Sequence, residues 1–495
     1  MTTVVDRTLE FDRCYRALAS RDARFDGWFV VGVRTTGIYC RPSCPAIVPR
    51  RSNVRFLRTA AAAQREGFRA CKRCRPDASP GSPEWNLRGD VVGRAMRMIA
   101  DGVVDREGVG GLAGRLGYSR RQLQRHLVAE VGAGPLAVAR AHRAQTARLL
   151  VESTDLPMSQ VAFAAGFGSL RQFNATVREV FATTPRDLRQ RARGDRSAAP
   201  GCVTLHLPAR APFAGDRVLA FLGARAVPGV EHHDGTAFHR TLRLPHGAGV
   251  ATLTAVQTGL RCDLKLTDLR DLGPAIHRCR RLADLDADAP GIATALSDDP
   301  VIGAQVRRVP GRRVPGAVDG VELAVRAVVG QQVSVAAARH LAATLVAEAG
   351  DDTGLSDPHV GRHFPTADAV ADAVDALGMP AARRATLRRL VTSVTRGDLR
   401  LDPGADARAT VAELSGLRGI GPWTTGYIAM RALHDPDAHP AGDAAVRRAL
   451  RVRGVEPDEH DTTLQRWRPW RAYAVMHLWA RPDDDWTCRE LLDHH

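Results

Sequence analysis

Residues 414–430 read LSGLRGIGPWTTGYIAM, and the GLRGIG segment inside this stretch decides how the C-terminal part of the chain folds. Glycines bound a short hairpin, and helical patterning lies on both sides of it, so a helix-hairpin-helix is predicted. Backbone amides at the start of the second helix can face a DNA phosphate, and hairpin carbonyls could hold a monovalent cation. Gly419 and Gly421 are therefore predicted to contact DNA.

The sequence on both sides makes the hairpin more specific. A proline follows Trp423 by thirteen residues, and AGDAAVRRAL comes next at 441–450. Upstream, alternating apolar residues at 203–209, 238–244 and 250–260 predict antiparallel strands. From about residue 320 onward the apolar spacing becomes helical, so a β-rich segment is expected to precede the helical one.

The stretch from about 203 to 495 resembles the AlkA family of alkylbase DNA glycosylases, within the helix-hairpin-helix superfamily. AVVGQQVSVAAARHL, GLRGIGPWTTGYIAMRAL, PAGDAAVRRAL and RWRPWRAYAVMHLWA carry the resemblance. It implies that Asp443 is the essential carboxylate and that Trp423, Tyr427 and Trp479 form the pocket for a base that has left the duplex. A fixed carboxylate can stabilise the positive charge that develops on the sugar, and aromatic faces favour a cationic base.

Two positions refine what this resemblance implies. Relatives that also nick DNA carry a lysine where this chain has Trp423, so a monofunctional glycosylase that leaves an abasic site is expected. Some relatives place an apolar wedge into the DNA stack at the position of Gln332. Gln332 is therefore predicted to insert into the DNA stack, although its side chain is polar. The other tryptophans, Trp467, Trp470 and Trp486, are expected to pack in the core.

Four grouped cysteines stand near the N-terminus, in GIYCRPSC at 37–44 and CKRC at 71–74. Cys40, Cys44, Cys71 and Cys74 form C-x3-C and C-x2-C pairs, which suit one tetrahedral Zn²⁺. On spacing alone, a purely structural zinc is the usual interpretation. The scattered cysteines are expected to be core or surface thiols: Cys14, Cys202, Cys262, Cys279 and Cys488.

The sequence around the cluster, VGVRTTGIYCRPSC and GFRACKRCRPD, resembles the N-terminal domain of the Ada family, which repairs methyl phosphotriesters in DNA. The resemblance covers about residues 10–78 and implies that Cys40 is the methyl acceptor. A zinc-bound thiolate can attack a methyl carbon while a phosphodiester anion leaves, and the thioether product makes the reaction single-turnover. Ada proteins often end in an alkylguanine transferase domain with a PCHR-type site, which this sequence lacks.

Arginine supplies almost all of the basic charge. Lys+Arg number 70 against 54 Asp+Glu, the formal charge is +16, and the only lysines are Lys72 and Lys265. Guanidinium groups suit phosphate and guanine, although a GC-rich genome would also enrich arginine. Side chains near the cysteine cluster are predicted to contact DNA phosphates: Arg41, Arg50, Arg51, Lys72 and Arg73.

An internal repeat lies between the cysteine cluster and the β-rich segment. LAGRLGYSRRQLQRHLVAEV at 112–131 resembles VAFAAGFGSLRQFNATVREVF at 161–181, and each copy reads as helix, glycine-aromatic turn and second helix. The repeat resembles the tandem helix-turn-helix domain of AraC-type transcription regulators, over roughly 88–193. The implied recognition helices present their N-terminal side chains to bases: Ser119, Arg120, Arg121, Gln122 and Arg125 on one, and Ser169, Arg171, Gln172 and Asn174 on the other.

The predicted fold class is multidomain α+β, with seams at 77–85, 191–201 and 307–320. The predicted domains are a small zinc-bound α/β methyl acceptor at 1–80, an all-α double helix-turn-helix at 88–193, an antiparallel β-rich domain at 202–305, and a helix-hairpin-helix glycosylase at 306–495.

The whole is similar to an Ada-AlkA fusion, which implies a DNA-3-methyladenine glycosylase joined to a single-turnover methyltransferase that activates the alkylation response. Zn²⁺ is the expected cofactor. Alkylated and promoter double-stranded DNA and RNA polymerase are the expected partners, and no membrane partner is expected. The N-terminus lacks a secretory pattern, so the cytoplasm, at the bacterial nucleoid, is the expected location. Two rivals stay open: a damage-sensing activator whose glycosylase-like region only binds DNA, and a regulator with a purely structural zinc.

Overall fold

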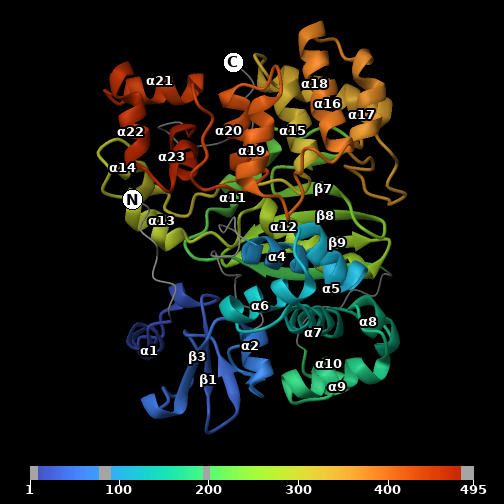
Figure 1. The fold of residues 1–495 in the computed structure, drawn as a ribbon, viewed down its shortest axis with the longest axis vertical. Helices are drawn as coiled ribbons and strands as arrows, with labels where there is room; N and C mark the ends of the chain where they lie inside the picture. Colours follow the sequence, from blue (N-terminus) through green and yellow to red (C-terminus); the bar gives the residue numbers. More distant parts are fainter. Residues whose placement is uncertain (1–8, 77–90, 193–200, 481–495) are drawn as a thin grey trace. The chain divides into compact units, whose positions relative to one another are not determined.

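The structure, a computed structural model, describes residues 9–76, 91–192 and 201–480. The chain divides into two compact units, Met1–Val203 and Thr204–His495 (Figure 1). The predicted seam at 77–85, most of the seam at 191–201, Trp486 and Cys488 lie outside the described residues.

A four-stranded sheet with the order β3-β1-β2-β4 forms the first part of the N-terminal unit. β1 pairs antiparallel with β2 and with β3, whereas β2 and β4 run parallel. Because Tyr39 pairs with Ala70, the chain leaves these two strands side by side, at Cys40 and Cys71. The elements are α1 (Phe11–Ala19), η1 (Ala23–Phe25), β1 (Val30–Val33), β2 (Ile38–Cys40), η2 (Arg51–Asn53), β3 (Val54–Leu57), α2 (Ala60–Arg65) and β4 (Arg69–Ala70).

Two helix-turn-helix copies make up the rest of this unit and confirm the predicted repeat. The turns contain Gly117 at φ 76° and Gly166 at φ 82°, a left-handed conformation that glycine adopts without a Cβ penalty. Ser119 and Ser169 then cap the second helix of each copy. The helices are α4 (Val91–Ala100), α5 (Val103–Leu116), α6 (Arg120–Val131), α7 (Pro135–Ser153), α8 (Met158–Ala164), α9 (Leu170–Phe181) and α10 (Pro185–Arg191).

The C-terminal unit begins with a five-stranded sheet of order β5-β9-β8-β7-β6, in which the β6-β7, β7-β8 and β8-β9 pairs are antiparallel. An antiparallel sheet is thus confirmed, and the predicted strands at 203–209 and 238–244 fall on β5 and β7. The segment 250–260, predicted as one strand, instead contains the end of β8, a turn and the start of β9. Figure 1 shows β7, β8 and β9 as the long neighbouring strands of this sheet. The elements are β5 (Cys202–Pro208), α11 (Gly215–Gly223), β6 (Glu231–His233), β7 (Ala237–Arg243), β8 (Ala248–Val256), β9 (Gly259–Leu266), η4 (Leu269–Asp271) and α12 (Leu272–Leu282).

Helices fill the rest of the C-terminal unit and enclose two hydrophobic cores. Trp467 is 1% exposed in one of them, which confirms its predicted core position, and Ile302 and Val306 pack in the same core. The helices are α13 (Ala289–Leu296), α14 (Gly303–Arg308), α15 (Gly320–Val329), α16 (Val335–Ala349), α17 (Ala367–Ala373), η5 (Val374–Ala376), α18 (Ala381–Thr395), α19 (Ala407–Gly416), α20 (Pro422–Arg431), α21 (Ala444–Val452), η6 (Pro457–Glu459), α22 (His460–Arg466) and α23 (Arg471–Leu478).

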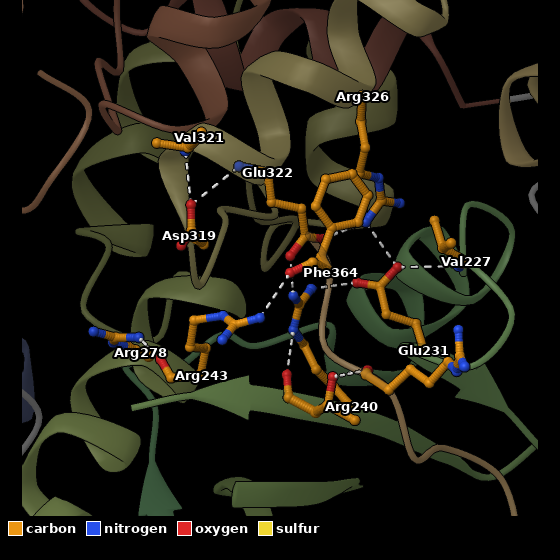
Figure 2. A network of polar contacts seen from close by, with 12 residues as sticks. Val227, Glu231, Arg240, Arg243, Arg278, Asp319, Val321, Glu322, Arg326 and Phe364 are labelled. Atoms are coloured by element: carbon orange, nitrogen blue, oxygen red, sulfur yellow. Dashed lines mark hydrogen bonds and ion pairs between the residues drawn. The ribbon is translucent and has the colours of Figure 1, made fainter. Parts of the chain in front are cut away.

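A buried ionic network ties the sheet to the first core helix. Figure 2 shows Glu231 of β6, Arg240 of β7, and Glu322 and Arg326 of α15 pointing toward one another. Arg240 forms hydrogen-bonded ion pairs with both carboxylates, and Nη1 of Arg326 lies 2.8 Å from Glu231 and 2.9 Å from Glu322. Although burial opposes ionisation, Arg240 and Arg326 hold the pKa of Glu322 below its ordinary value. In this network each of the two arginines contacts both carboxylates.

Replacing Glu322 with glutamine should destabilise the C-terminal unit by about 3–5 kcal/mol, because the change leaves Arg240 and Arg326 sharing one buried carboxylate. Thermal unfolding, with hydrogen exchange of α15 and β7, would measure the loss. Glu413→Gln, on an exposed face of α19, is the matched control and should change stability by less than about 0.5 kcal/mol. Equal effects of the two substitutions would contradict a role for the network.

A buried acid near the end of α12 makes the stability of the C-terminal unit depend on pH. Burial raises the pKa of Asp284 to about 7, against the attraction of Arg313, and the carboxyl accepts hydrogen bonds from Tyr473 at 2.9 Å and from the Val314 amide at 3.2 Å. Between about pH 4 and 7 the folded state then holds a proton that the unfolded state has lost. The contribution of Asp284 to stability accordingly weakens as the pH rises through this window.

Asp284→Asn should therefore raise the melting temperature at pH 8 by more than at pH 5, because asparagine keeps an acceptor oxygen and carries no charge. Asparagine also tolerates the left-handed φ of 51° at this position. Melting curves at both pH values, with the exposed Asp372→Asn as control, would measure the difference. A gain of equal size at the two pH values would show that ionisation of Asp284 is not its cause.

Candidate functional site

The four predicted cysteine ligands come together at one end of the N-terminal sheet. Their sulfur atoms all lie within 4.8 Å of one another, and Cys40, at 9% exposure, is the least buried of the four. The amide of Cys71 donates to the carbonyl of Tyr39 at 3.0 Å, which fixes Cys71 beside Cys40. The turn that carries Cys44 is held by buried Asp26, whose carboxylate accepts from the amide and hydroxyl of Ser43 at 3.0 and 2.6 Å.

This donor set fits Zn²⁺. The hydrogen bond with Cys74 and burial raise the pKa of Cys40, while the same hydrogen bond lowers the pKa of Cys74 to about 6. Four buried thiols this close together cannot all ionise unless a cation joins them, and four thiolates at about 2.3 Å are the usual tetrahedral ligands of zinc. Cys40, Cys44, Cys71 and Cys74 would hold the ion.

The basic residues near the cluster differ in what they contact. Arg41 lies 3.5 Å from Asp26, and Arg51 pairs with Asp12 and packs over the Tyr15 ring. Lys72 donates to the carbonyl of Ala182, after α9, at 3.2 Å. Arg50 and Arg73 are exposed. Phosphate contacts by these five residues stay a prediction.

The predicted base-reading residues lie at the starts of α6 and α9. Ser119, Arg120, Arg121, Gln122 and Arg125 are exposed on α6. Ser119 and Gln122 form a capping box, in which the serine hydroxyl accepts from the Gln122 amide at 3.2 Å and Gln122 Oε1 accepts from the Ser119 amide at 3.1 Å. These two side chains therefore hold the helix start, whereas the three arginines make no part of the cap and are exposed.

The second recognition helix repeats this arrangement. Ser169 accepts from the Gln172 amide at 3.2 Å, and Gln172 Oε1 accepts from the Gly168 amide at 3.3 Å. Arg171 is exposed and Asn174 is half-buried. Base reading by either helix stays a prediction. Among the predicted residues, the arginines are the best candidates for contacting bases.

A cleft of about 990 Å³ in the C-terminal unit brings Asp443 together with all three predicted pocket aromatics. Asp443 is the N-cap of α21, and its Oδ1 accepts from the Val446 amide at 2.8 Å. Its carboxylate also accepts from the indole N–H of Trp423 at 2.8 Å and from that of Trp479 at 3.1 Å. Three donors from α20, α21 and the end of α23 thus fix the carboxylate at the cleft.

The aromatic rings form a curved wall beside this carboxylate. Trp423 and Tyr427, one helical turn apart on α20, stack with centroids 5.2 Å apart and planes 7° apart. Trp479 lies 6.4 Å from Tyr427 and stacks at 6.3 Å on Phe221 of α11. Flat rings around a fixed anion suit a planar, electron-poor ligand.

The hairpin closes another side of the cleft. Gly419 has φ 97°, and a Cβ at this position would lie 2.0 Å from Thr386 Oγ1, so only glycine fits. Gln331 Nε2 donates to the Gly419 carbonyl at 3.0 Å and to Thr424 Oγ1 at 2.9 Å. Gly421 is the N-cap of α20, which begins at a proline. The helix-hairpin-helix is therefore present as predicted.

Comparisons with known proteins match each part of the chain. Residues 13–77 match the metal binding domain of Ada, 112–191 match a helix-turn-helix domain, and 204–319 match the AlkA N-terminal domain. A Mycobacterium tuberculosis protein named "Probable bifunctional transcriptional activator/DNA repair enzyme AlkA" is 54% identical over 98% of this chain and 99% of its own length. This chain belongs to that bifunctional AlkA family.

Two further relatives match separate parts of this AlkA-family chain. DNA-3-methyladenine glycosylase 2 of Escherichia coli is 32% identical over 54% of this chain and 94% of its own length. The bifunctional transcriptional activator/DNA repair enzyme Ada of Escherichia coli is 38% identical over 28% of this chain and 37% of its own length. The predicted Ada-AlkA combination and the multidomain fold class are thus confirmed.

Three cleft residues of this AlkA-family protein were not predicted from its sequence: Arg225, Arg326 and Arg431. Arg431 donates to the Tyr427 hydroxyl at 2.6 Å, and burial lowers the pKa of Arg225 to about 10. In a sequence, an arginine is normally assigned to the surface. No local pattern indicated that these three arginines line the cleft. Phe221, which precedes the hairpin by about 195 residues, likewise could not be assigned to this region from the sequence.

Gln332 has a left-handed φ of 55° between α15 and α16, and its exposed side chain lies at the mouth of the cleft. This position is compatible with the predicted insertion into DNA, which stays a prediction. Within 9–76, 91–192 and 201–480, every helix is too short or too polar to cross a membrane.

Proposed function

We propose that Cys40 and Asp443 perform two separate repair reactions in this bifunctional transcription regulator and DNA repair enzyme. Cys40 would accept a methyl group from a DNA methyl phosphotriester, and Asp443 would support hydrolysis of the N-glycosidic bond of alkylated bases such as 3-methyladenine. The observation that carries the proposal is the fixed Asp443 carboxylate beside the Trp423–Tyr427 stack, in a chain that also holds a four-cysteine cluster.

Methyl transfer needs a thiolate and a good leaving group. Bound Zn²⁺ would keep the four sulfurs ionised at neutral pH. The Sγ of Cys40 then attacks the methyl carbon, a C–S bond forms, and the C–O bond breaks as its electron pair leaves with the phosphodiester. The thioether has no ready route back to thiolate, so each chain reacts once.

Base excision needs a base outside the duplex and an anion near its sugar. The rings of Trp423, Tyr427 and Trp479 would stack on the flipped base. An alkylated purine with a cationic ring leaves without prior protonation, so one carboxylate can suffice. Asp443 would stabilise the developing positive charge or orient water. Trp423 in place of a lysine supports a monofunctional reaction.

One substrate preparation tests both reactions. Methylated DNA incubated with purified protein should release methylated base in excess of the protein concentration, whereas methyl transfer should stop at one group per chain. Chromatography of released bases and peptide mass analysis would count the two products. DNA binding without base release would instead favour an activator whose AlkA-like region is only a DNA-binding module.

Methylation of Cys40 should raise affinity for promoter DNA, because it removes one negative charge from the cluster. One charge at about 5 Å from a phosphate is worth about 3 kcal/mol at an effective dielectric near 20, before salt screening. Binding titrations of methylated and unmethylated protein should therefore differ by about 10-fold or more at low salt. Arg121→Ala should weaken both forms, whereas Arg261→Ala on β9 should not. Equal affinities of the two wild-type forms would refute the switch.

The same proposal extends to a protein partner, a location in the cell and a bound cation. We propose that the DNA-bound regulator recruits RNA polymerase, that it works at the bacterial nucleoid, and that a monovalent cation binds hairpin carbonyls near Gly419. Replacing K⁺ with a large organic cation at equal ionic strength should weaken binding to alkylated DNA if the cation site exists.

A further inference from the structure

A second group of metal-binding side chains lies in the C-terminal unit, separate from the cysteine cluster. Asp234, His239 and His359 each offer a ligand atom, and the three atoms lie within 4.8 Å of one another. Asp234 follows β6, His239 lies within β7, and His359 lies in the segment between α16 and α17. Residues 120 positions apart in the chain therefore meet at one edge of the sheet.

The turn between β6 and β7 aims one carboxylate oxygen of Asp234 at this point. Its Oδ1 accepts from the amides of Thr236 and Ala237 at 2.8 and 2.7 Å. Its Oδ2 lies 3.3 Å from Nε2 of His239. One oxygen thus holds the turn, and the other faces the imidazole.

His239 is oriented as metal-binding histidines usually are. The residue is 8% exposed, and its Nδ1 lies 3.2 Å from Oγ1 of Thr252, the residue paired with it on β8. In the tautomer that donates from Nδ1 to this oxygen, Nε2 carries a lone pair directed at Asp234 and His359. Metal-bound histidines typically donate their other N–H to an oxygen in this way.

The main chain holds His359 in place. Its amide donates to Oδ1 of Asp357 at 3.0 Å, and the next residue, Val360, forms a bridge with Gly229. The His359 ring lies 4.5 Å from that of His239 and stacks at 4.5 Å, with planes 4° apart, on His232.

We propose that Asp234, His239 and His359 bind one divalent first-row transition ion, with Zn²⁺ as the first candidate. Two imidazoles and one carboxylate are ligands that Zn²⁺ accepts, and the exposure of Asp234 and His359 leaves a further position for water. The ion would join the sheet edge to the segment before α17. Because it would bind the folded unit, it would also stabilise that unit.

Untagged full-length protein, with zinc in the cysteine cluster, should be dialysed into metal-free buffer and then titrated with Zn²⁺. We expect one additional zinc per chain by calorimetry and elemental analysis, and a rise of about 5 °C in the melting temperature at about 100-fold excess over the dissociation constant. His359→Gln and Asp234→Asn should abolish both signals. Asparagine can still accept the turn hydrogen bonds of Asp234, and His359 is exposed, so both variants should fold.

Two controls make the result specific. His340→Gln, an exposed histidine on α16, should keep the additional zinc, and so should Cys14→Ser in the N-terminal unit. The proposal is overturned if zinc-loaded wild type takes up no further Zn²⁺, or if His359→Gln and Asp234→Asn bind it as wild type does.

Discussion

Asp443→Asn should lower the rate of alkylated-base release by about 100- to 1000-fold while the protein still binds alkylated DNA. The substitution removes the negative charge that would face the developing positive charge on the sugar. Asparagine is as good an N-cap as aspartate, so α21 should keep its start at the Val446 amide. Single-turnover release of methylated bases, with a parallel DNA-binding titration, would measure the two effects.

Asp443→Asn should also disturb the hydrogen bonds that the Asp443 carboxylate accepts. Both carboxylate oxygens accept from indole N–H groups, of Trp423 and Trp479. An asparagine amide has only one acceptor oxygen, so one indole must lose its partner or shift. The aromatic wall would therefore be less well fixed in the variant, and weaker binding of a flipped base should accompany the slower chemistry.

Asp319→Asn is the matched control for this experiment. Asp319 is also a helix N-cap in the same unit, with Oδ1 2.7 Å from the Val321 amide and 3.0 Å from the Glu322 amide (Figure 2). Asp319 is not one of the residues that line the cleft. Its replacement should leave base release within about twofold of wild type. Similar rates for wild type and Asp443→Asn would exclude the carboxylate from the chemistry.

The sequence predicted those parts of the sites that depend on local spacing. The four cysteines stand in two short motifs, and the strands before Cys40 and Cys71 turned out to be neighbours in one sheet. Asp443 follows the hairpin by about twenty residues, and the family resemblance identified it. In both cases, short spacing along the chain and a dense motif were sufficient to predict which residues lie together in the structure.

Contacts between distant segments were not predicted from the sequence. Phe221 of α11 stacks on Trp479, Arg225 after α11 lines the cleft, and Arg240 reaches Glu322 across 82 residues. Charged residues are normally assigned to the surface, because burying them is costly unless partners are present. Only the fold supplies these partners, so the buried network could not be predicted from the sequence.

Ser119 and Gln122 illustrate a different limit. Their position at the start of a recognition helix predicts base contacts, yet the same position demands a helix cap. The structure uses both side chains for the capping box, so the neighbouring arginines are the better candidates for base reading.

The two proposed repair reactions differ in whether the reacting residue can be used again, and the two residues lie in different units. In the proposed reactions, the hydrogen bonds that hold Asp443 would survive each turnover, whereas Cys40 would be consumed by methyl transfer. A reagent that is used once can report how much damage has occurred, because the methylated fraction records the number of events. Cys40 is therefore the residue whose replacement should affect both repair and regulation.

Cys40→Ala should abolish methyl transfer from methyl phosphotriesters, from about one methyl group per chain to none, because the attacking sulfur is removed. Base release by the same protein should be unchanged, since Asp443 lies in the other unit. Peptide mass analysis after incubation with methylated DNA would locate and count the methyl groups. Promoter affinity should also stop responding to methylated DNA.

Loss of zinc could imitate this result, so the comparison needs a second variant. Cys14→Ser removes a buried thiol from the same unit, outside the cluster, where burial raises the pKa of the thiol to about 11. It should keep both zinc and methyl transfer. Zinc analysis of Cys40→Ala, with Cys44, Cys71 and Cys74 still present, separates loss of the acceptor from loss of the ion. A methyl group on Cys44, Cys71 or Cys74 of wild type, with Cys40 unmodified, would assign the acceptor role to another ligand, and an unmodified cluster would make the zinc purely structural.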